Sequence, residues 1–352
     1  MDALTLGYII IIILVSLYLL ILILTYWYQN PKLNNTNTTN NNNNTNMSTV
    51  TYTSFGKRGD MGNQIFQLAC IIAAGKRSKA KIVLPEQIKT LPLSQLFTFD
   101  SFEILNVKPE GIYREYDNYE DITIPSDGKV YDIRGYRQAY KYFEDHSEEI
   151  RRIFTPNKSI LDRMKEVLPK KYIAVHIRKG DYIKTIHKIP LLREFRRCQL
   201  EYYKKGIIKL KEFYPDYPVL ICTDSPKWVK PLLSELDSAA ILAPIPKDLD
   251  PKFSDFCTLY LSDGVVISNS TYSFWAAYLR KDHQVIAPSP WWDPSGFIGT
   301  GMGLNGPYLQ YPDWWLLDTD TGKILYEPHR NNTLDTNSDT LNLYKLIRGL
   351  IL

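Results

Sequence analysis

The sequence predicts an α/β protein built from two halves of mainly parallel sheet, behind an N-terminal membrane anchor. Three observations support this. An uncharged apolar segment opens the chain, a strand, a glycine loop and a helix follow it, and β-branched runs alternate with helical patterns further on. Strands that alternate with helices are typical of βαβ units, whose strands lie parallel. Two such halves facing each other would form a ligand-binding cleft.

The first segment is a predicted membrane anchor. Residues 3–28 include no charged side chain, and Ile9–Leu24 consists almost entirely of Ile, Leu, Val and Tyr. This length can cross a bilayer as a helix. It is too long for the core of a signal peptide and lacks a basic region and a small-residue cleavage site. We therefore expect an uncleaved anchor over residues 1–29 that contacts lipid, although its closest flanking charges, Asp2 and Lys32, do not fix its orientation.

An asparagine-rich stretch follows the anchor. Ten asparagines lie between Asn30 and Asn46, with several threonines among them. Such a composition has too few apolar groups to form a core, so residues 30–48 are predicted to be a disordered stalk. Glycosylation sequons in this tract arise easily by chance and are weak evidence for a glycosylating compartment. Others begin at Asn157, Asn269 and Asn331.

Charge and cysteine content narrow the function classes. The chain has 352 residues and a net charge of +4, with 42 basic residues against 38 acidic ones. A nucleic-acid-binding protein usually concentrates basic residues on one face, so we expect no nucleic-acid partner. The cysteines are far apart and show no C-x-x-C pair, which predicts no zinc site and mostly buried thiols, with one disulfide left open. They are Cys70, Cys198, Cys222 and Cys257.

The first globular half, residues 49–165, begins with a predicted βαβ unit. Residues 49–55 alternate as a strand, residues 56–62 form a glycine-punctuated loop, and residues 63–76 carry apolar side chains at helical spacing. A second strand is predicted at residues 82–84. The tyrosine-rich stretch that follows shows no clear period and receives no assignment.

The second half, residues 166–352, repeats this alternation and should contain a mainly parallel sheet. Its strands are predicted from β-branched apolar runs, and its helices from apolar residues at helical spacing. The predicted strands are 172–177, 219–222, 241–242, 265–268 and 285–287, and the predicted helices are 192–213, 226–236, 253–262 and 272–281.

Polar side chains gather where three of these strands end. The clusters are His176–Tyr182, Thr223–Ser225 and Ser268–Ser273, and Asp255 lies in the helix before the third. In open α/β sheets, ligands bind just beyond the carboxyl ends of the strands. Hydroxyl groups between a strand and a helix can cap that helix or present an anion site, and for the third cluster taken alone capping is the more common outcome. Convergence of all three clusters at one sheet edge favours a binding site.

The first of these clusters has the chemistry of a phosphate site. Arg178 offers a bidentate fork that suits phosphate oxygens, and Lys179 adds a point charge beside it. The alternative is a solvated charge cluster at a strand end. Convergence with the other two clusters makes the phosphate site the stronger hypothesis.

Three motifs together resemble the α-1,2-fucosyltransferases of glycosyltransferase family 11. They are Gly59–Gln67, His176–Tyr182 and Asp255–Leu279, which occur in the family's order, and the resemblance covers about residues 49–292. It implies a GT-B-like pair of facing Rossmann-type domains and an inverting, metal-independent transfer of L-fucose from GDP-fucose. The acceptor it implies is the 2-hydroxyl of a galactose-terminated glycan. The N-terminal anchor matches the type II membrane topology of animal members, which implies a Golgi or equivalent secretory membrane.

The resemblance also implies donor-binding roles. Arg178 would hold the β-phosphate that departs with the negative charge, and Lys179 would support it. His176 and Asp255 would contact guanine, since a carboxylate can accept hydrogen bonds from both the ring N–H and the exocyclic amine. The remaining phosphate contacts would come from Ser270 and Thr271.

Two residues are candidates for the acceptor side and for proton transfer. Asn63, in the glycine-loop motif, would face the cleft near the acceptor. Asp181 is either a general base or an anchor for Arg178. The chain departs from the family's usual pattern at Lys179, where an arginine is common, and at Asp60–Met61, where a small or apolar pair is more usual. The first departure would loosen the phosphate contact, and the second would alter the acceptor side.

A D-x-D pattern is a decoy for a metal site. Asp318 and Asp320 match the motif by which another class of glycosyltransferase binds a metal, but Thr321–Lys323 follow between two apolar runs, which indicates a hairpin turn. We expect no metal cofactor. Two alternatives to the leading function stay open: a fucosyltransferase of another linkage or acceptor, and a membrane-tethered glycan-binding protein with a decayed site.

Overall fold

The structure is a computed structural model that describes residues 47–57, 59–114, 119–179, 198–291 and 308–328. The expected anchor, nearly all of the expected stalk, and Asp181 lie outside the described residues. Within these ranges, no helix is long and apolar enough to cross a membrane.

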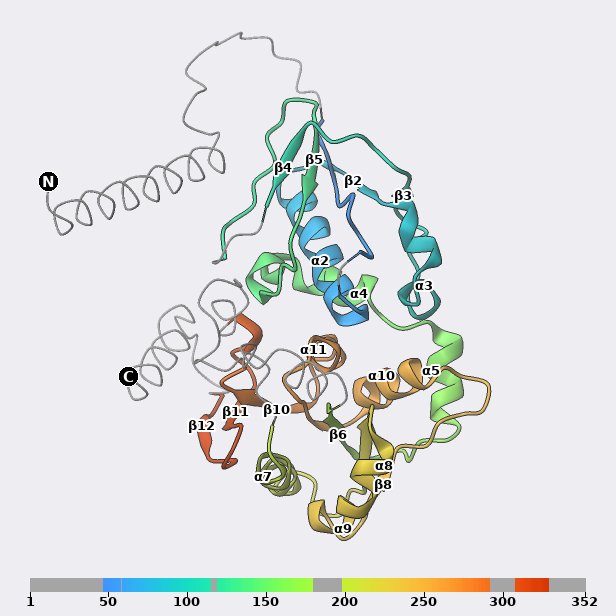
Figure 1. Ribbon diagram of the computed structural model, residues 1–352, viewed down its shortest axis with the longest axis vertical. Coiled ribbons are helices and arrows are strands. Elements are labelled where there is room, and N and C mark those ends of the chain that lie inside the picture. Colours follow the sequence, from blue (N-terminus) through green and yellow to red (C-terminus); the bar gives the residue numbers. More distant parts are fainter. Residues whose placement is uncertain (1–46, 58, 115–118, 180–197, 292–307, 329–352) are drawn as a thin grey trace, which may run out of the picture. The chain divides into compact units, whose positions relative to one another are not determined.

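The first half contains a five-stranded sheet in the order β3-β2-β1-β5-β4, and all its strand pairs are parallel (Figure 1). The strands are β1 (Thr49–Thr51), β2 (Lys81–Leu84), β3 (Glu103–Ile104), β4 (Gly111–Tyr113) and β5 (Val130–Ile133). The helices are α2 (Met61–Arg77), α3 (Leu93–Leu96), α4 (Ser147–Ile153) and α5 (Lys158–Lys165), with 3-10 turns η2 (Glu86–Thr90), η3 (Tyr140–Tyr142) and η4 (Glu144–His146).

The second half contains a seven-stranded sheet in the order β12-β11-β10-β9-β6-β7-β8, parallel except for β12. Without β12, this is the 3-2-1-4-5-6 order of dinucleotide-binding sheets. The strands are β6 (Ile173–Ile177), β7 (Val219–Thr223), β8 (Ala240–Leu242), β9 (Gly264–Val266), β10 (Gln284–Ser289), β11 (Trp315–Asp318) and β12 (Ile324–Tyr326). The helices are α7 (Leu200–Lys211), α8 (Pro226–Val229), α9 (Leu233–Leu236), α10 (Pro251–Leu261) and α11 (Thr271–Tyr278), with the 3-10 turn η5 (Lys230–Leu232).

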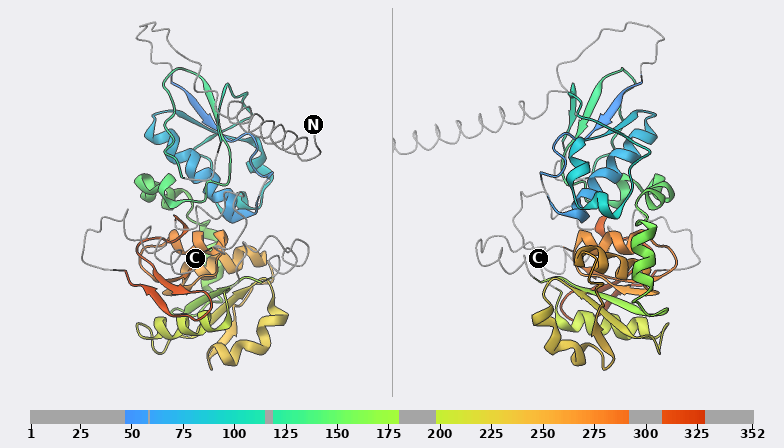
Figure 2. Two further views of the ribbon diagram at one scale, coloured as in Figure 1. Left: turned by 60° about the vertical axis from the view of Figure 1, so that its left-hand side comes forward. Right: turned by 90° about the vertical axis from the view of Figure 1, so that its right-hand side faces the viewer.

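Helices cover both faces of the second sheet, as its sequence pattern requires. β6 is buried along its whole length because successive side chains enter different clusters. Ile173 and Val175 pack with the cluster that includes α7, whereas Ala174 packs with α10 and α11. In Figure 2, α7 and the orange helices α10 and α11 lie on opposite faces of this sheet. His176 follows the same alternation and therefore lies on the α10 and α11 face.

The prediction of an α/β fold with parallel sheets is confirmed. The elements that were predicted wrongly or not assigned differ for physical reasons. The helix predicted at residues 226–236 is broken into α8, η5 and α9. Pro231 explains the break, because proline has no N–H to donate and its ring crowds the preceding turn. In the unassigned tyrosine-rich stretch the structure has β3 and β4, which are only two and three residues long. Strands that short carry no readable period.

Buried aromatic rings join the two halves. Phe66 of α2 lies 4.8 Å from the rings of both Phe274 and Trp275 in α11, measured between ring centroids. Phe143 of the first half lies 5.0 Å from Trp275. All four rings are fully buried and belong to one core cluster that spans both sheets. This contact is built like a domain core rather than like a surface between mobile domains.

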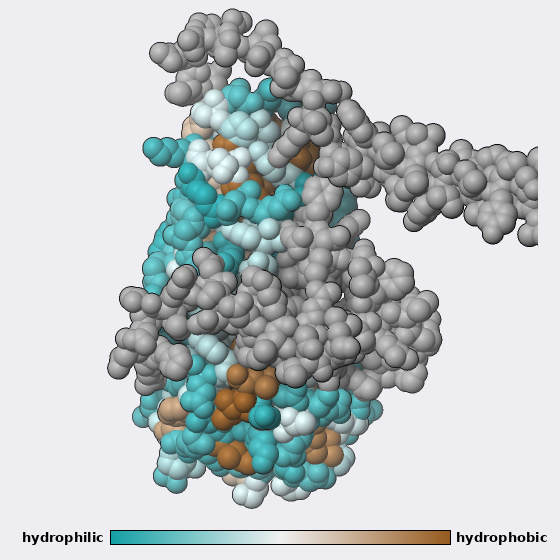
Figure 3. All heavy atoms as spheres, turned by 90° about the vertical axis from the view of Figure 1, so that its left-hand side faces the viewer, coloured by the Kyte–Doolittle hydropathy of each residue, from teal (hydrophilic) through white to brown (hydrophobic). Residues whose placement is uncertain are grey.

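Outside this core, the cysteines and the described surface show no feature that indicates a second site. None of the four cysteines forms a disulfide bond, and Cys198 is the one that is not fully buried. Asn269 is only 1% exposed, so its sequon is not accessible in the folded chain. The face drawn in Figure 3 is mostly hydrophilic where the residues are described, with small separate hydrophobic patches. Scattered exposed apolar residues of this kind are normal for a protein surface.

Candidate functional site

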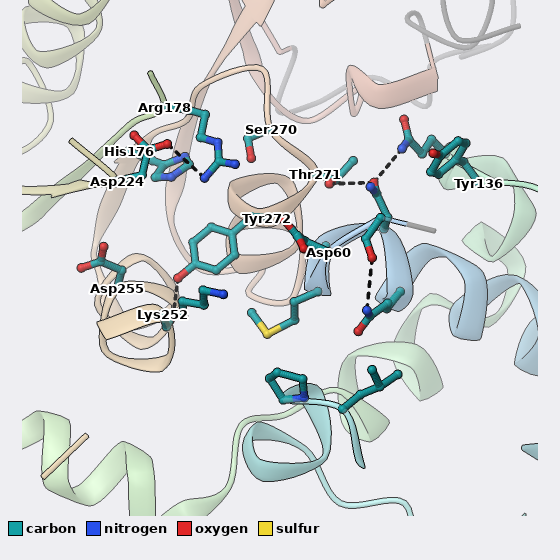
Figure 4. A pocket seen from close by; sticks show the side chains of 18 of the residues that line it. Asp60, Tyr136, His176, Arg178, Asp224, Lys252, Asp255, Ser270, Thr271 and Tyr272 are labelled. Carbon is teal, nitrogen blue, oxygen red and sulfur yellow. Dashed lines mark hydrogen bonds and ion pairs between the residues drawn. The ribbon is translucent and has the colours of Figure 1, made fainter. Parts of the chain in front are cut away.

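The strand order places a crevice at the carboxyl end of the second sheet. β6 pairs with β7 on one side and with β9 on the other, so the connections leave β6 and β9 in opposite directions. Such a switch point is where ligands bind in open α/β sheets. A cavity of about 890 Å³ opens here, lined by residues from both halves (Figure 4). Its volume lies in the range of small-molecule sites.

Arg178 and Asp224 form an ion pair at this crevice. Arg178 follows β6 and Asp224 follows the neighbouring β7, and their Nη1 and Oδ2 atoms lie 3.1 Å apart. The other carboxylate oxygen of Asp224 accepts a hydrogen bond from the backbone N–H of Lys179 at 3.0 Å. Asp224 therefore fixes both the guanidinium and the chain that carries it. Arg178 lines the cavity and keeps about a quarter of its side chain exposed, so it can also meet an anion.

His176 is held neutral beside this pair. Its Nδ1 lies 2.8 Å from the hydroxyl of Ser268, which follows β9, and its side chain is 4% exposed. Burial and the nearby Arg178 cation lower the pKa of His176 to about 3. The imidazole also packs on the ring of Tyr272, with centroids 5.4 Å apart. A neutral, fixed imidazole suits hydrogen bonding to a ligand better than it suits proton transfer near pH 7.

Asp255 of α10 lines the same cavity with a perturbed carboxyl group. The pKa of Asp255 is raised from 3.8 to about 7, mainly by burial and to a smaller extent by the nearby Asp224, although hydrogen bonds with Cys222 and with the backbone of Thr223 oppose the shift. A carboxyl group that stays partly protonated near neutral pH has too few hydrogen-bond donors around its oxygens to stabilise the negative charge. A ligand that offers N–H groups at this point would therefore favour the ionised form.

The start of α11 has the features of an anion-binding helix N-terminus. Ser270 is its N-cap residue, yet its side chain makes no capping hydrogen bond, and it is 9% exposed. The first turn contains no acidic residue. Free N–H groups at a helix start, with the positive end of the helix dipole, favour negatively charged ligands. In Figure 4 the Ser270 hydroxyl lies on the same side of the cavity as Arg178.

Thr271 and Asn63 connect the two halves across the cavity. Asn63 Oδ1 accepts a hydrogen bond from Thr271 Oγ1 at 3.0 Å and a second from Gln138 Nε2 at 2.7 Å. The neighbouring Gly62 makes the approach close enough, because a Cβ there would lie 2.4 Å from the backbone nitrogen of Tyr272. The starts of α2 and α11 therefore meet at the cavity.

The structure brings together six of the eight residues singled out from the sequence. His176, Arg178, Asp255, Ser270, Thr271 and Asn63 all line the cavity. Lys179 is not among its lining residues, and its Nζ lies 3.3 Å from the ring centroid of Trp228. The phosphate role of Lys179 stays a prediction. Asp181 falls outside the described residues, so its role also stays a prediction.

Several lining residues were missed in the sequence. Asp224 belongs to the predicted cluster Thr223–Ser225, but the sequence pattern fits a turn residue there equally well. Its ion pair with Arg178 depends on the fold. Lys252 is at the start of α10, and its carbonyl accepts a hydrogen bond from the Tyr272 hydroxyl. Tyr136 and Gln138 follow β5, and a prediction of that strand would have placed them at a sheet edge.

The D-x-D pattern forms a turn. Asp318 ends β11, and its Oδ1 accepts hydrogen bonds from the backbone N–H groups of Asp320 and Thr321 and from the Thr321 hydroxyl. β11 and β12 pair as an antiparallel hairpin around it, which confirms the predicted turn. Among the described residues, no group of three or more His, Cys, Asp or Glu side chains could hold a metal ion.

Comparison with known proteins gives the family. The chain is 26% identical over 273 residues to an α-1,2-colitosyltransferase of Escherichia coli, covering 67% of this chain and 90% of that protein. It is 21% identical over 280 residues to galactoside α-(1,2)-fucosyltransferase 2 of Sus scrofa, covering 76% and 80%. The solved structure of POFUT1 in complex with GDP matches with a TM-score of 0.44 at 14% identity, covering 68% of this chain and 96% of that one. The model of glycosyl transferase family 11 matches residues 10–298, so the chain belongs to that family.

Proposed function

We propose that this protein is a membrane-anchored, inverting α-1,2-fucosyltransferase that moves L-fucose from GDP-fucose to the 2-hydroxyl of a galactose-terminated glycan. The observation that carries the proposal is the anion site formed by Arg178 and the start of α11. It lies in one cavity with His176 and Asp255, in a chain of glycosyltransferase family 11. The two α/β halves that share this cavity would be arranged as in GT-B-like glycosyltransferases.

The donor would lie along the carboxyl edge of the second sheet. Its diphosphate would contact Arg178, the Ser270 hydroxyl and the N–H groups that begin α11. Its guanine would donate two hydrogen bonds to ionised Asp255 and contact His176. The unused N-cap hydroxyl of Ser270 and the raised pKa of Asp255 support this placement, since each group lacks the partner that such a ligand would supply.

The reaction would be a direct displacement. The acceptor hydroxyl oxygen forms a bond to C1 of fucose, the bond from C1 to the β-phosphate oxygen breaks, and GDP leaves with the bonding electrons. The hydroxyl proton passes to a base, for which Asp181 is the candidate. Arg178 and the dipole of α11 stabilise the charge that develops on the leaving diphosphate, and effects of this kind usually dominate catalysis. On this mechanism the transfer requires no metal ion.

A second donor is favoured by a specific observation. A relative of 26% identity transfers colitose in the same α-1,2 linkage. A GDP-linked colitose donor would use the same nucleotide site and differ only at the sugar. Fucosylation of another hydroxyl and glycan binding without turnover are the remaining alternatives. The apolar segment at residues 3–28 supports a membrane anchor, which is also part of the proposal. Its type II orientation in a Golgi-like secretory membrane is proposed from the resemblance to animal members of the family.

A donor and acceptor screen of the full-length protein tests the proposal. GDP-fucose and GDP-colitose are offered with lactose, N-acetyllactosamine and free galactose, and the linkage of any product is determined. We expect α-1,2-linked fucose on the galactose residue. Colitosylated product in place of fucosylated product would support the second donor. The absence of both transfer and millimolar GDP binding would contradict an enzyme function.

Two arms of the same screen test the charge mechanism. Arg178→Ala should abolish transfer and weaken GDP binding by roughly 2–5 kcal/mol, because the buried diphosphate loses the guanidinium that pairs with it. Arg178→Lys should restore little, since a point charge does not reproduce the fork. Transfer should persist in EDTA and in the double variant Asp318→Ala, Asp320→Ala. Activity that is lost in EDTA and returns with Mn²⁺ would overturn the metal-independent mechanism.

A further inference from the structure

The first sheet has a switch point of its own at the cavity. Its order, β3-β2-β1-β5-β4, reverses between β1 and β5, which lie side by side and parallel. The loop after β1 includes Gly56, Lys57 and Gly59 and leads into α2, and the loop after β5 contains Gly135–Gln138. Both loops contribute lining residues to the cavity, as do the loops that follow β6 and β9 in the second half. The donor proposed above occupies the second crevice, which leaves the first one for another ligand.

The loop Gly135–Gln138 is held by its own hydrogen bonds. Gly135 has a φ of +114°, and the hydroxyl of the buried Tyr52 both donates to its carbonyl at 2.6 Å and accepts from its N–H at 3.2 Å. Arg137 has a φ of +55°, which is unusual for a residue with a side chain. Backbone conformations of this kind persist where the surrounding contacts fix them, and they cluster at functional sites.

A buried guanidinium fixes the strained residue. The Arg137 side chain is 2% exposed and donates to the carbonyls of Arg134 at 2.9 Å and Tyr113 at 2.9 Å, and to the Tyr142 hydroxyl at 3.2 Å. These contacts turn Arg137 away from the cavity. The residues before and after it in the sequence, Tyr136 and Gln138, both line the cavity.

The two presented side chains differ in chemistry. Tyr136 is half-buried and lines the cavity with an aromatic ring (Figure 4). Gln138 is 6% exposed and donates through Nε2 to Asn63 Oδ1, which also accepts from Thr271. Two hydrogen bonds occupy the oxygen of the Asn63 amide and so fix the direction of its NH₂ group. An aromatic ring and an oriented amide that line the same cavity are suitable for a sugar, whose ring has an apolar C–H face and a polar hydroxyl edge.

We propose that the loop Gly135–Gln138 forms the subsite for the acceptor sugar. Tyr136 is the platform on which one face of the sugar packs, and Gln138 is a positioning residue that acts through Asn63. The proposal rests on the proposed function, in which the other ligand of the cavity is a hydroxyl-bearing sugar. It adds the residues that recognise this sugar, which lie at the switch point of the first sheet.

Substitutions at Tyr136 test the platform in the full-length protein. Tyr136→Ala should raise the KM for N-acetyllactosamine at least tenfold, while the Kd for GDP, measured by calorimetry, stays within twofold. Tyr136→Phe keeps the ring and should restore the KM to within about threefold of wild type. Phe213→Ala is the matched control, because Phe213 is a partly exposed aromatic residue, 40% exposed, that does not line the cavity. It should leave both constants unchanged.

An isosteric change tests the positioning role of Gln138. Gln138→Glu keeps the size of the side chain but replaces the donor to Asn63 with an acceptor. We expect kcat to fall at least tenfold with the GDP Kd close to that of wild type, and a lower melting temperature because the new carboxylate is buried beside an acceptor oxygen. Gln95→Glu, an exposed position outside the cavity, should change none of the three. A change that acts only through folding would lower the melting temperature and the GDP affinity together.

Failure of this inference can be told apart from failure of the proposed function. Transfer by the wild type with an unchanged acceptor KM in Tyr136→Ala would overturn the subsite and leave the function standing. The same holds if acceptor KM and GDP Kd change by equal factors, which would place Tyr136 at the donor. Saturation-transfer NMR with N-acetyllactosamine and GDP detects binding without turnover. A wild-type protein that neither transfers sugar nor binds this acceptor would overturn both proposals.

Discussion

At the scale of single residues, Asp255 shows how a binding site departs from what stability alone would select. Burial raises the pKa of its carboxyl group to about 7, and the neighbouring Asp224 adds to the effect. The folded protein therefore binds a proton at Asp255 more tightly than the unfolded chain does. This group's contribution to the free energy of unfolding falls as pH rises from about 4 to about 7, because the folded state must then ionise a partly desolvated group.

Asp255→Asn should separate stability from nucleotide recognition. Asparagine is neutral at every pH, so the variant should be more stable than wild type at pH 8 by on the order of 1–2 kcal/mol. Its GDP affinity should fall at least tenfold, because an amide cannot accept two donated hydrogen bonds as a carboxylate can. At pH 6, GDP binding should release about one more proton from wild type than from the variant. Calorimetry in buffers of different ionisation enthalpy measures this difference, and equal proton release would show that Asp255 does not meet the base.

At the scale of elements, the cavity depends on two helix starts that meet. Gly62 lies in the first turn of α2, and a Cβ there would lie 2.4 Å from the nitrogen of Tyr272 and 2.5 Å from the carbonyl carbon of Thr271. These neighbours are backbone atoms at the start of α11 and cannot rotate away. The absence of a side chain at this position allows the hydrogen bond between Asn63 and Thr271 to form.

Gly62→Ala should therefore damage the site more than the fold. Forcing the two helices apart should cost about 1–3 kcal/mol, as overpacking usually does, and transfer should fall at least a hundredfold. Gly206→Ala in α7 is the matched control, because the three atoms nearest its new methyl group belong to the side chains of Val266 and Ile286 rather than to backbone. It should keep GDP binding and transfer even if stability changes. Full activity in Gly62→Ala, measured beside chemical denaturation, would show that this contact does not shape the cavity.

The elements also show which parts of the protein can be predicted from its sequence. β6 and β7 are five-residue strands whose β-branched runs are readable, so the position of Arg178 just beyond a strand end can be predicted. β5 is four residues long in a tyrosine-rich stretch, so the loop that follows it gives no signal. The pairing of Arg178 with Asp224 joins residues 46 positions apart. Such a contact depends on the order of the strands, which local pattern does not determine.

At the scale of the whole molecule, the aromatic cluster links the folding of both halves. Trp275 of α11 is fully buried and packs on Phe66 at 4.8 Å, Phe143 at 5.0 Å and Phe154 at 5.9 Å, all of which belong to the first half. Arg151 of the first half also donates to the carbonyl of Tyr278 at 2.9 Å. Because each half completes the other's core, neither should remain folded when the other unfolds.

The wild-type protein should thus unfold in one cooperative transition. Far-UV circular dichroism, which reports both halves, and loss of GDP binding, which reports the cavity, should have the same midpoint in urea. Trp275→Ala should cost about 3–5 kcal/mol, as large-to-small core substitutions do, and should separate the two midpoints. Trp275→Phe should cost much less, because it keeps a ring and removes an indole N–H that donates to no described residue. Coincident midpoints in Trp275→Ala would show that the two halves are joined by something other than this cluster. Separate midpoints in wild type would show that the halves unfold independently.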